Sequence, residues 1–422
     1  LIIRRIIFKN NNLWTVLLLM VGCSNNPADN QLLEKIFNSM GNDFPEIVSD
    51  PEKYRIQIQY SQIDRDVNQK PKFTTYTFRT DSNKYFYPAS TVKFPSAVLA
   101  LDKLKIYSFQ NIDKNTHLTI GGGYDGMTEV IEDISSINKR ASIAHYIKKI
   151  LLISDDDAFN RIYEFLGQEH LNKRMWGIGY DDFRVSHRLS LPLSLEENQY
   201  TNPFNFYDNL GKKILIQPMQ HSKLKFEIST KENFIGNAYL KNGKKINSAM
   251  DFTQKNYFKL SDQHQFLQQV IFPGTIINED QKLNLSESDY NFLYEWMQKL
   301  PRESIFPNYN DYSKYYDGYC KFFIYGDSKE KMPDNIKIFN SVGWAYGFLI
   351  DNAYIIDTVN DIEFFLSAVI YVNKNEILND DQYQYYELGL PFLANLGKII
   401  YDYELKREIA VSPDFSRYSP KY

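Results

Sequence analysis

Strand patterns lie at both ends of the chain. Residues 54–60 alternate apolar and polar side chains, and residues 73–78 and 84–87 continue the same pattern. Near the other end, residues 347–357 and 362–372 predict two further strands. A two-stranded hairpin on its own buries too little apolar surface to be stable in water. We therefore expect the two ends to pair in one antiparallel sheet, although the whole middle of the chain separates them.

Helical patterns fill the middle of the chain. The predicted helices there cover residues 90–107, 141–152, 157–167, 261–271 and 286–299. A last amphipathic helix fits residues 383–408, with an interruption near Pro391. Strands first, helices next and strands last predict an α+β fold. In this fold a mainly helical lobe, about residues 95–330, is inserted between the two halves of the sheet.

Composition excludes several classes of protein. The 422 residues can bury a substantial core, as one large domain or as two to three smaller ones. The chain has 48 Lys and Arg residues against 52 Asp and Glu residues, so nucleic acid is not an expected partner. The two cysteines, Cys23 and Cys320, are too few for a disulfide framework or a cysteine zinc site. The six histidines lack metal-binding spacing, so we expect no metal and no other cofactor.

The first residues have the pattern of an export signal. Arg4, Arg5 and Lys9 give a positive start, and residues 13–22 form an apolar stretch that is too short for a transmembrane helix. We interpret residues 1–22 as this signal. After it, no apolar run reaches the roughly 20 residues that span a bilayer, so the sequence excludes a multi-pass membrane protein.

A cysteine follows the apolar stretch directly. Residues 20–23, Met-Val-Gly-Cys, resemble a bacterial lipobox, in which the cysteine is lipidated and becomes the mature N-terminus. The alternative is a plain secretory signal with a fortuitous cysteine. We expect residues 23–50 to form a lipid-anchored tether and the start of an N-terminal helix. The protein would then lie in a bacterial cell envelope, facing the periplasm or the outside, with Cys23 as its only membrane contact.

Ser90 and Lys93 form the first candidate for chemistry. In the motif S-x-x-K, positions i and i+3 of a helix lie on one face, so the hydroxyl and the amine can approach each other. Free backbone N–H groups at a helix start can also hold an oxyanion. Three more copies of the motif start at Ser136, Ser222 and Ser328. Only Ser90 precedes a strongly apolar helix, where burial would lower the pKa of Lys93. The alternative is that Ser90 only caps this helix.

Two further motifs follow in the chain. The first, Ser154-Asp155-Asp156, lies between two predicted helices, and the second, Ser341-Val342-Gly343, leads into a predicted strand. Both have an ordinary structural alternative. A serine or aspartate just before Ala158 is a good helix N-cap, and glycines can open a strand.

Together the three motifs, in this order, resemble the S-x-x-K, S-D-N and K-T-G motifs of class A β-lactamase-like serine hydrolases. The resemblance spans about residues 50–405, and the segment 157–167 adds to it. We therefore expect residues 51–422 to form one β-lactamase-like domain. The resemblance implies no cofactor, and it implies a small-molecule or peptidoglycan-like substrate.

The resemblance also implies roles for the matched residues. Ser90 would attack a carbonyl carbon, Lys93 would act as the base, and Ser154 would relay a proton. The backbone N–H groups of Ser90 and Trp344 would form the oxyanion hole. The residues implied to contact the substrate are Asp156, Ser341, Val342 and Gly343.

Three positions depart from the family pattern. Ser341 stands in place of the K-T-G lysine, and Val342 stands in place of its hydroxyl residue. Asp156 replaces the asparagine of S-D-N. Losing a cation and gaining a carboxylate both favour protonated Lys93, which opposes its use as a base.

A deacylating glutamate is also missing from its usual place. Where the family keeps an R-x-E motif, this chain reads Ser-His-Arg-Leu-Ser at residues 186–190. The nearest carboxylates are Glu196 and Glu197, which we expect to be solvated loop charges. A cation that compensates for the missing K-T-G lysine could come from Arg188, Lys337 or another residue.

The sequence therefore predicts an exported serine hydrolase that acts on an acyl or amide carbonyl through an acyl-enzyme on Ser90. A β-lactam and a cell-wall peptide are both candidate substrates. The alternative is a catalytically weak or inactive cell-envelope binding protein that kept the fold. We expect a monomer.

Overall fold

The computed structural model describes residues 30–124 and 127–418. The expected export signal, residues 1–22, and the expected lipidation site, Cys23, lie outside this part of the chain. Within the described residues, no helix is long and apolar enough to cross a membrane.

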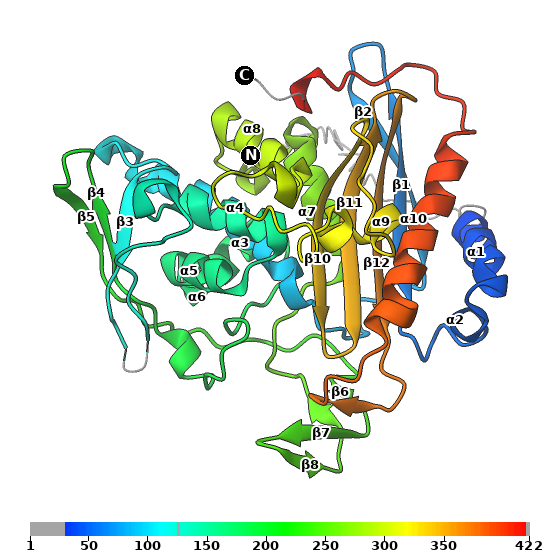
Figure 1. Ribbon diagram of the computed structural model, residues 1–422, viewed down its shortest axis with the longest axis horizontal. Helices are drawn as coiled ribbons and strands as arrows, with labels where there is room; N and C mark the ends of the chain where they lie inside the picture. Colours follow the sequence, from blue (N-terminus) through cyan, green and yellow to red (C-terminus); the bar gives the residue numbers. More distant parts are fainter. Residues whose placement is uncertain (1–29, 125–126, 419–422) are drawn as a thin grey trace, which may run out of the picture.

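A five-stranded antiparallel sheet joins the two ends of the chain (Figure 1). Its strands, in spatial order, are β10 (Ile336–Ala345), β11 (Phe348–Asp357), β12 (Ile362–Tyr371), β1 (Gln57–Arg65) and β2 (Pro71–Phe78). The early strand β1 pairs with the late strand β12, from Gln57 opposite Val369 to Gln62 opposite Phe364. This pairing confirms the predicted α+β architecture, in which helices are inserted between the two halves of one sheet.

The structure departs from the predicted strands in two places. Strand β10 already begins at Ile336, ahead of the Ser341 motif, whereas the sequence predicts a strand only after that motif. Residues 84–87, predicted to be a strand, form only a single bridge at Lys84. The rings of residues 85–87 are all buried, so this segment has no solvent face and packs into the core instead.

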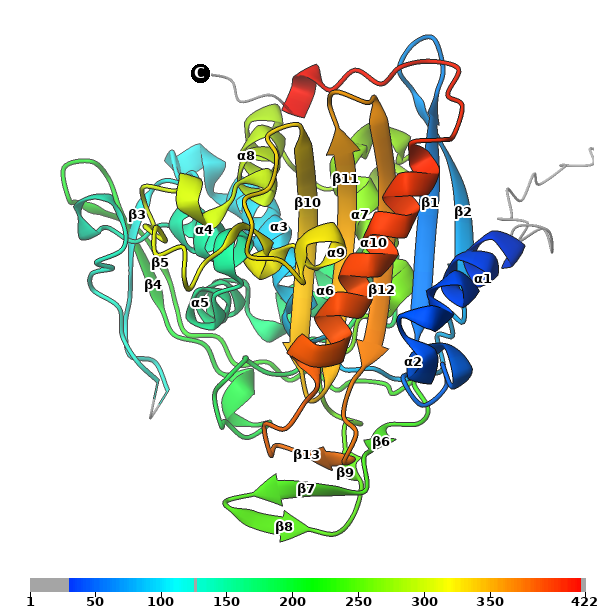
Figure 2. The ribbon, with the colours of Figure 1, turned by 45° about the vertical axis from the view of Figure 1, so that its right-hand side comes forward.

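Helices cover both faces of the sheet (Figure 2). The helices on one face are α1 (Asn30–Ser39) and α10 (Leu390–Glu404), and those on the other face are α7 (Leu260–Ile271) and α8 (Glu287–Gln298). The predicted interruption near Pro391 is present. A π-helical turn covers Tyr385–Gly389, and Pro391 lies in the first turn of α10.

The remaining long helices form a lobe beside the β10 edge of the sheet (Figure 1). They are α3 (Lys93–Leu104), α4 (Ile143–Ile153), α5 (Asp156–Leu166) and α6 (Gln168–Gly177). Every residue of α3 is buried, because the other three helices pack against it. Helix α6 is not predicted from the sequence. Only two of its four buried residues, Leu171 and Met175, are apolar, so its apolar periodicity is weak.

Several short elements complete the fold. The short helices are α2 (Pro45–Ser49) and α9 (Phe322–Tyr325). The strands of the three small sheets are β3 (His117–Ile120), β4 (Phe204–Tyr207) and β5 (Lys213–Gln217), then β13 (Ile377–Leu378), β7 (Ala238–Lys241) and β8 (Lys244–Ile246), then β6 (Phe234–Ile235) and β9 (Met250–Asp251). These strands have two to five residues, which is too short for a periodic sequence pattern.

The central strands are buried on both faces. Side chains of β12 alternate between two core clusters: Phe365 and Val369 pack toward the helical lobe, whereas Phe364 and Leu366 pack toward α10. All ten residues of β12 are buried. The sheet is therefore covered on both faces at its centre, and its β10 edge faces the start of α3.

Candidate active site

Ser90 lies in a tight turn that leads into α3. A 3-10 turn covers Ala89–Val92, and Ala89 has a left-handed φ of +48°. Such a conformation costs a non-glycine residue about 1–3 kcal/mol and is held by its surroundings. Here Thr91 holds it, because both its backbone N–H and its hydroxyl donate to the Pro88 carbonyl, at 3.1 and 2.8 Å. The turn leaves the half-buried Ser90 at the start of the helix.

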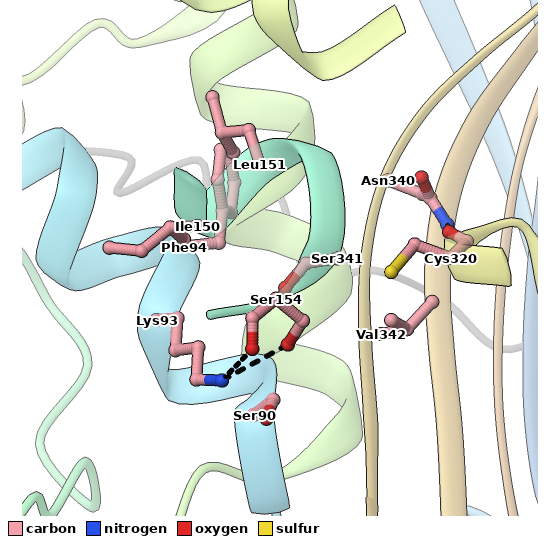
Figure 3. Close-up of a pocket in the computed structure, with 10 residues that line it drawn as sticks. All are labelled: Ser90, Lys93, Phe94, Ile150, Leu151, Ser154, Cys320, Asn340, Ser341 and Val342. Atoms are coloured by element: carbon pink, nitrogen blue, oxygen red, sulfur yellow. Dashed lines mark hydrogen bonds between the residues drawn. The ribbon is translucent and has the colours of Figure 1, made fainter. Parts of the chain in front are cut away.

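Lys93 begins α3, and its side chain is buried with 1% exposure. Its amine donates to Asp156 Oδ1 at 2.5 Å. It also donates to Ser154 Oγ at 3.1 Å and to the Ser154 carbonyl (Figure 3). These three acceptors match the three N–H donors of a protonated amine. Among the described residues, Ser90 Oγ forms no hydrogen bond with this amine.

Two opposing effects act on the proton of Lys93. Burial, the larger effect, lowers the pKa of the amine from its ordinary value. The Asp156 carboxylate raises this pKa but does not cancel the effect of burial. The expectation that Asp156 favours the protonated form therefore holds in direction, while the net shift is toward easier deprotonation.

The Ser154-Asp155-Asp156 motif forms the corner between α4 and α5. Ser154 ends α4 in a left-handed conformation with φ +57°, and its N–H donates to Ile150 O at 2.9 Å. Asp155 is the N-cap of α5 and accepts from the Ala158 N–H at 2.7 Å. The corner thus places the Ser154 hydroxyl and the Asp156 carboxylate on the Lys93 amine.

A further residue, Ser190, completes the contacts of Asp156. The Ser190 hydroxyl donates to Asp156 Oδ2, the oxygen that does not contact Lys93. The neighbouring backbone is fixed by Asn160 on α5. This side chain accepts from the N–H of Leu189 and donates to its carbonyl, both at 2.9 Å. Sequence reasoning missed Ser190, because only the folded chain brings residues 186–190 onto the corner of α5.

Strand β10 packs closely against the Ser90 turn. A Cβ atom added at Gly343 would lie 2.7 Å from the Pro88 carbonyl oxygen and 3.1 Å from the Ser90 nitrogen. Only glycine fits here without movement of the backbone, since real Cβ contacts are longer. Gly343 therefore lets the edge of the sheet approach the start of α3.

The register of β10 fixes the direction of the Trp344 N–H. The strand is at an edge of the sheet and turns into β11 at Tyr346 and Gly347, with φ of +53° and +85°. Hydrogen-bonded and non-hydrogen-bonded pairs alternate from such a two-residue turn, so Trp344 and Leu349 form a non-hydrogen-bonded pair. The Trp344 N–H consequently points away from β11, toward the open edge where the Ser90 turn packs.

Ser341 and Val342 line the same small cavity as Lys93. A cavity of about 20 Å³, large enough for one water molecule, is lined by Ser90, Lys93, Ser154 and Ser341 among others (Figure 3). Val342 also borders this cavity, but it is buried and packs in the core under α10. These two residues offer one hydroxyl and no charge.

Neither candidate cation replaces the missing lysine. Arg188 is buried in the helical lobe, where its Nε donates to Glu164 Oε1 at 3.1 Å. Lys337 precedes Ser341 by four residues on β10, which corresponds to about 13 Å along a strand. Glu196 and Glu197 do not line the cavity or the cleft beside Ser90, in line with the expectation that they are loop charges.

A buried cation that sequence reasoning missed lies behind β10. The Lys321 amine donates to Met297 O, Ile338 O and Asn340 Oδ1, at 2.7, 2.8 and 2.7 Å. Burial lowers the pKa of Lys321 to about 8. All three of its donors are used within the fold. It therefore supports the strand and its neighbour Asn340 rather than presenting a charge to a ligand.

A cleft of about 360 Å³ opens beside Ser90. Asp156, Ser190 and the exposed Trp344 also line it. Among the described residues, no group of three or more His, Cys, Asp or Glu side chains could hold a metal ion. The arrangement thus provides a hydroxyl, a buried amine and an open strand edge at one end of a cleft.

Comparisons with known proteins identify the family to which the chain belongs. A model of the β-lactamase enzyme family matches residues 70–403. No curated protein matches the chain. Solved structures with similarity include β-lactamases from Xanthomonas campestris pv. campestris (12% identity, TM-score 0.48, covering 87% of this chain and 98% of that one) and from Desulfarculus baarsii (12%, 0.48, 90% and 99%). A third is a β-lactamase from Burkholderia ambifaria (12%, 0.47, 84% and 96%).

The contact at Gly343 gives a prediction about stability. Gly343→Ala should lower the free energy of unfolding by about 1–3 kcal/mol, the usual cost of overpacking, because its methyl group meets a backbone carbonyl that cannot move aside. Urea unfolding measures the change. Gly177→Ala is the matched control, since a Cβ there meets nothing within 4 Å. If both variants are as stable as the wild type, β10 does not press on the Ser90 turn.

Proposed function

Because the chain belongs to the β-lactamase enzyme family, we propose that it is a serine hydrolase that forms an acyl-enzyme on Ser90. The Lys93 amine carries this proposal: it is buried, its pKa is lowered, and Lys93 lines one small cavity together with Ser90 and Ser154. A base whose pKa lies closer to neutral is better matched to proton transfer at physiological pH.

Acylation then proceeds in two steps, addition to the carbonyl and loss of the leaving group. Neutral Lys93 takes the proton of the Ser90 hydroxyl, directly or through Ser154, while Ser90 Oγ bonds to the carbonyl carbon of the substrate. The N–H groups of Ser90 and Trp344 stabilise the oxyanion that forms. Collapse of this intermediate breaks the bond to the leaving group, which takes its proton from Lys93 through Ser154. Water later hydrolyses the ester.

One observation favours a second candidate function. In the resting structure the Lys93 amine gives all three of its donors to Ser154 and Asp156 and none to Ser90. This contact pattern is that of a protonated amine, which is no base. A catalytically weak cell-envelope binding protein that keeps the fold is therefore the alternative to the hydrolase.

The site is less well suited to a penicillin than to acyl donors that lack a carboxylate. A penicillin carries a carboxylate, and neither Ser341 nor Val342 offers a cation to receive it. Loss of a charged hydrogen-bonding partner typically costs about 1.5–3 kcal/mol of binding, which is roughly tenfold to a hundredfold in affinity. Without the family's deacylating glutamate at its usual place, the ester on Ser90 should also hydrolyse slowly.

We therefore expect a fluorescent penicillin to acylate Ser90 slowly and to leave a long-lived adduct. Gel fluorescence over time gives both rates, and intact-protein mass gives the adduct. Ser90→Ala should abolish labelling, whereas Ser136→Ala, Ser222→Ala and Ser328→Ala, the serines of the other S-x-x-K copies, should label like the wild type.

Three results would count against parts of this proposal. Labelling that persists in Ser90→Ala would remove Ser90 as the nucleophile. Rapid penicillin hydrolysis at neutral pH would mean that another cation receives the carboxylate. A neutral fluorophosphonate that fails to label the folded wild type would favour the binding protein instead.

We also propose that the protein is exported and held at a bacterial membrane by lipid on Cys23, as a monomer with its hydrolase domain in residues 51–422. The positive start, the short apolar stretch and the lipobox-like residues 20–23 support this location.

In cells fed labelled palmitate, we expect incorporation into the wild type and not into Cys23→Ala. Cys320→Ala, which removes the other cysteine, should incorporate the label normally, because Cys320 is buried in the fold. Equal incorporation into wild type and Cys23→Ala would rule out this anchor.

A further inference from the structure

The cleft beside Ser90 has an aromatic wall. The rings that line it are those of Tyr87, Trp344, Tyr346, Tyr383 and Tyr385. They form contacts with one another: the ring centroids of Trp344 and Tyr385 are 5.7 Å apart, and those of Tyr383 and Tyr385 are 5.2 Å apart. The segment that carries Tyr383 and Tyr385 joins β13 to α10 and runs below the end of the sheet (Figure 2).

Backbone contacts hold two of these rings in place. The Tyr385 hydroxyl accepts from the Gly347 N–H, and the Tyr383 hydroxyl accepts from the Asn379 N–H, both at 2.8 Å. Each hydroxyl group thus anchors its ring to the backbone at the edge of the aromatic wall. The wall is pre-formed, so a ligand that binds against it does not have to order these side chains.

The charges of the cleft are negative. Its lining contains two carboxylates, Asp156 and Asp381, and among the described lining residues there is no lysine or arginine. Asp156 is paired with Lys93, but Asp381 is exposed and forms no ion pair with a described residue. The nearby Lys255 amine lies over the Tyr346 ring, 5.5 Å from its centroid, and does not line the cleft.

Aromatic rings beside an unpaired carboxylate are suited to one kind of ligand. The face of an aromatic ring attracts a cation, most strongly for tryptophan, and a nearby carboxylate adds to that attraction. The same surroundings repel an anion and offer a neutral apolar group only its contact area. Trp344 also supplies the N–H proposed for the oxyanion hole, so a cation on this wall lies near the reacting carbonyl.

We propose that the cleft selects acyl substrates that carry an ammonium group, bound between Asp381 and the rings of Trp344 and Tyr385. This inference rests on the proposed function for its reaction, but it concerns only which substrates the cleft accepts. It is consistent with the absence of a cation at Ser341, because a positively charged substrate would be repelled by a lysine at that position.

Three matched 4-nitrophenyl esters test the selectivity. Their acyl chains are identical except at the end, which carries trimethylammonium, its neutral isostere tert-butyl, or carboxylate. Release of nitrophenolate measures kcat/KM at low and at high salt. We expect the ammonium ester to exceed the tert-butyl ester by about three- to fivefold, the size of a partly exposed cation–π contact. The carboxylate ester should be slowest, and added salt should narrow the differences.

A pair of charge-matched variants locates the effect. Asp381→Asn should reduce the ratio of ammonium to tert-butyl rates toward one. An asparagine tolerates the left-handed backbone of this position, where φ is +57°. Glu387→Gln is the control: it removes an exposed carboxylate from the neighbouring π-helical turn, outside the cleft lining, and should leave the ratio unchanged.

Binding without reaction separates this inference from the proposed function. Tetramethylammonium should bind to Ser90→Ala, measured as a change in tryptophan fluorescence, and should bind more weakly when Asp381→Asn is added. If it binds while no ester reacts, the selectivity stands and the hydrolase fails. If the esters react at equal rates, or if Asp381→Asn changes neither the rate ratio nor the binding, the inference is wrong and the hydrolase remains.

Discussion

The contact between Lys93 and Asp156 is the interaction on which the candidate site depends. It joins the start of α3 to the start of α5, with Ser154 at the end of α4 between them. Burial drives the amine toward its neutral form, and the carboxylate at 2.5 Å draws it back toward the charged form. A buried amine without this partner would be costly in its charged form. One amine therefore joins the starts of α3 and α5 and the end of α4 beside Ser90.

The sheet contributes the second side of the candidate site, the edge strand β10. Its β10 edge, which pairs with no further strand, lies against the Ser90 turn, and Gly343 allows the two to come close. Behind the strand, Asn340 links the Lys321 amine to the Asp351 carboxylate, and both of these are buried. Charge is thus buried on each side of β10. On one side lies the Lys93–Asp156 pair beside Ser90, and on the other Lys321 donates to the Ile338 carbonyl and to Asn340 of the strand.

Local patterns carry much of the fold but only part of the site. The alternation in β1 is visible in the sequence, and β12 is recognisable there as a strand. The pairing of the two chain ends could be predicted because neither hairpin would be stable alone. The motifs of Ser90, Ser154 and Ser341 are also local, and the fold brings them to one cavity. Ser190, Lys321 and Asp381 carry no local signal. Each acquires its place through contacts between distant segments, which periodicity does not record.

The departures from the family pattern acquire a physical meaning only in three dimensions. Arg188 looks like a free cation in the sequence, yet it is buried against Glu164. Asp156 looks like a loss of function, yet its contact with Lys93 is the one that orders the site. The aromatic wall is invisible in a chain with 32 tyrosines, because nothing local marks which of them face the cleft.

The pH dependence of Ser90 labelling tests the role of the Lys93–Asp156 contact most directly. With a neutral fluorophosphonate, the labelling rate should rise as pH increases through the pKa of Lys93, because only the neutral amine accepts the serine proton. Asp156→Asn removes a contribution that raises this pKa, so the rise should move to lower pH by about one unit or more. Asp157→Asn, a charge-matched change at a mainly exposed neighbour, should not move it. A rise that stays in place or moves to higher pH in Asp156→Asn would contradict the account.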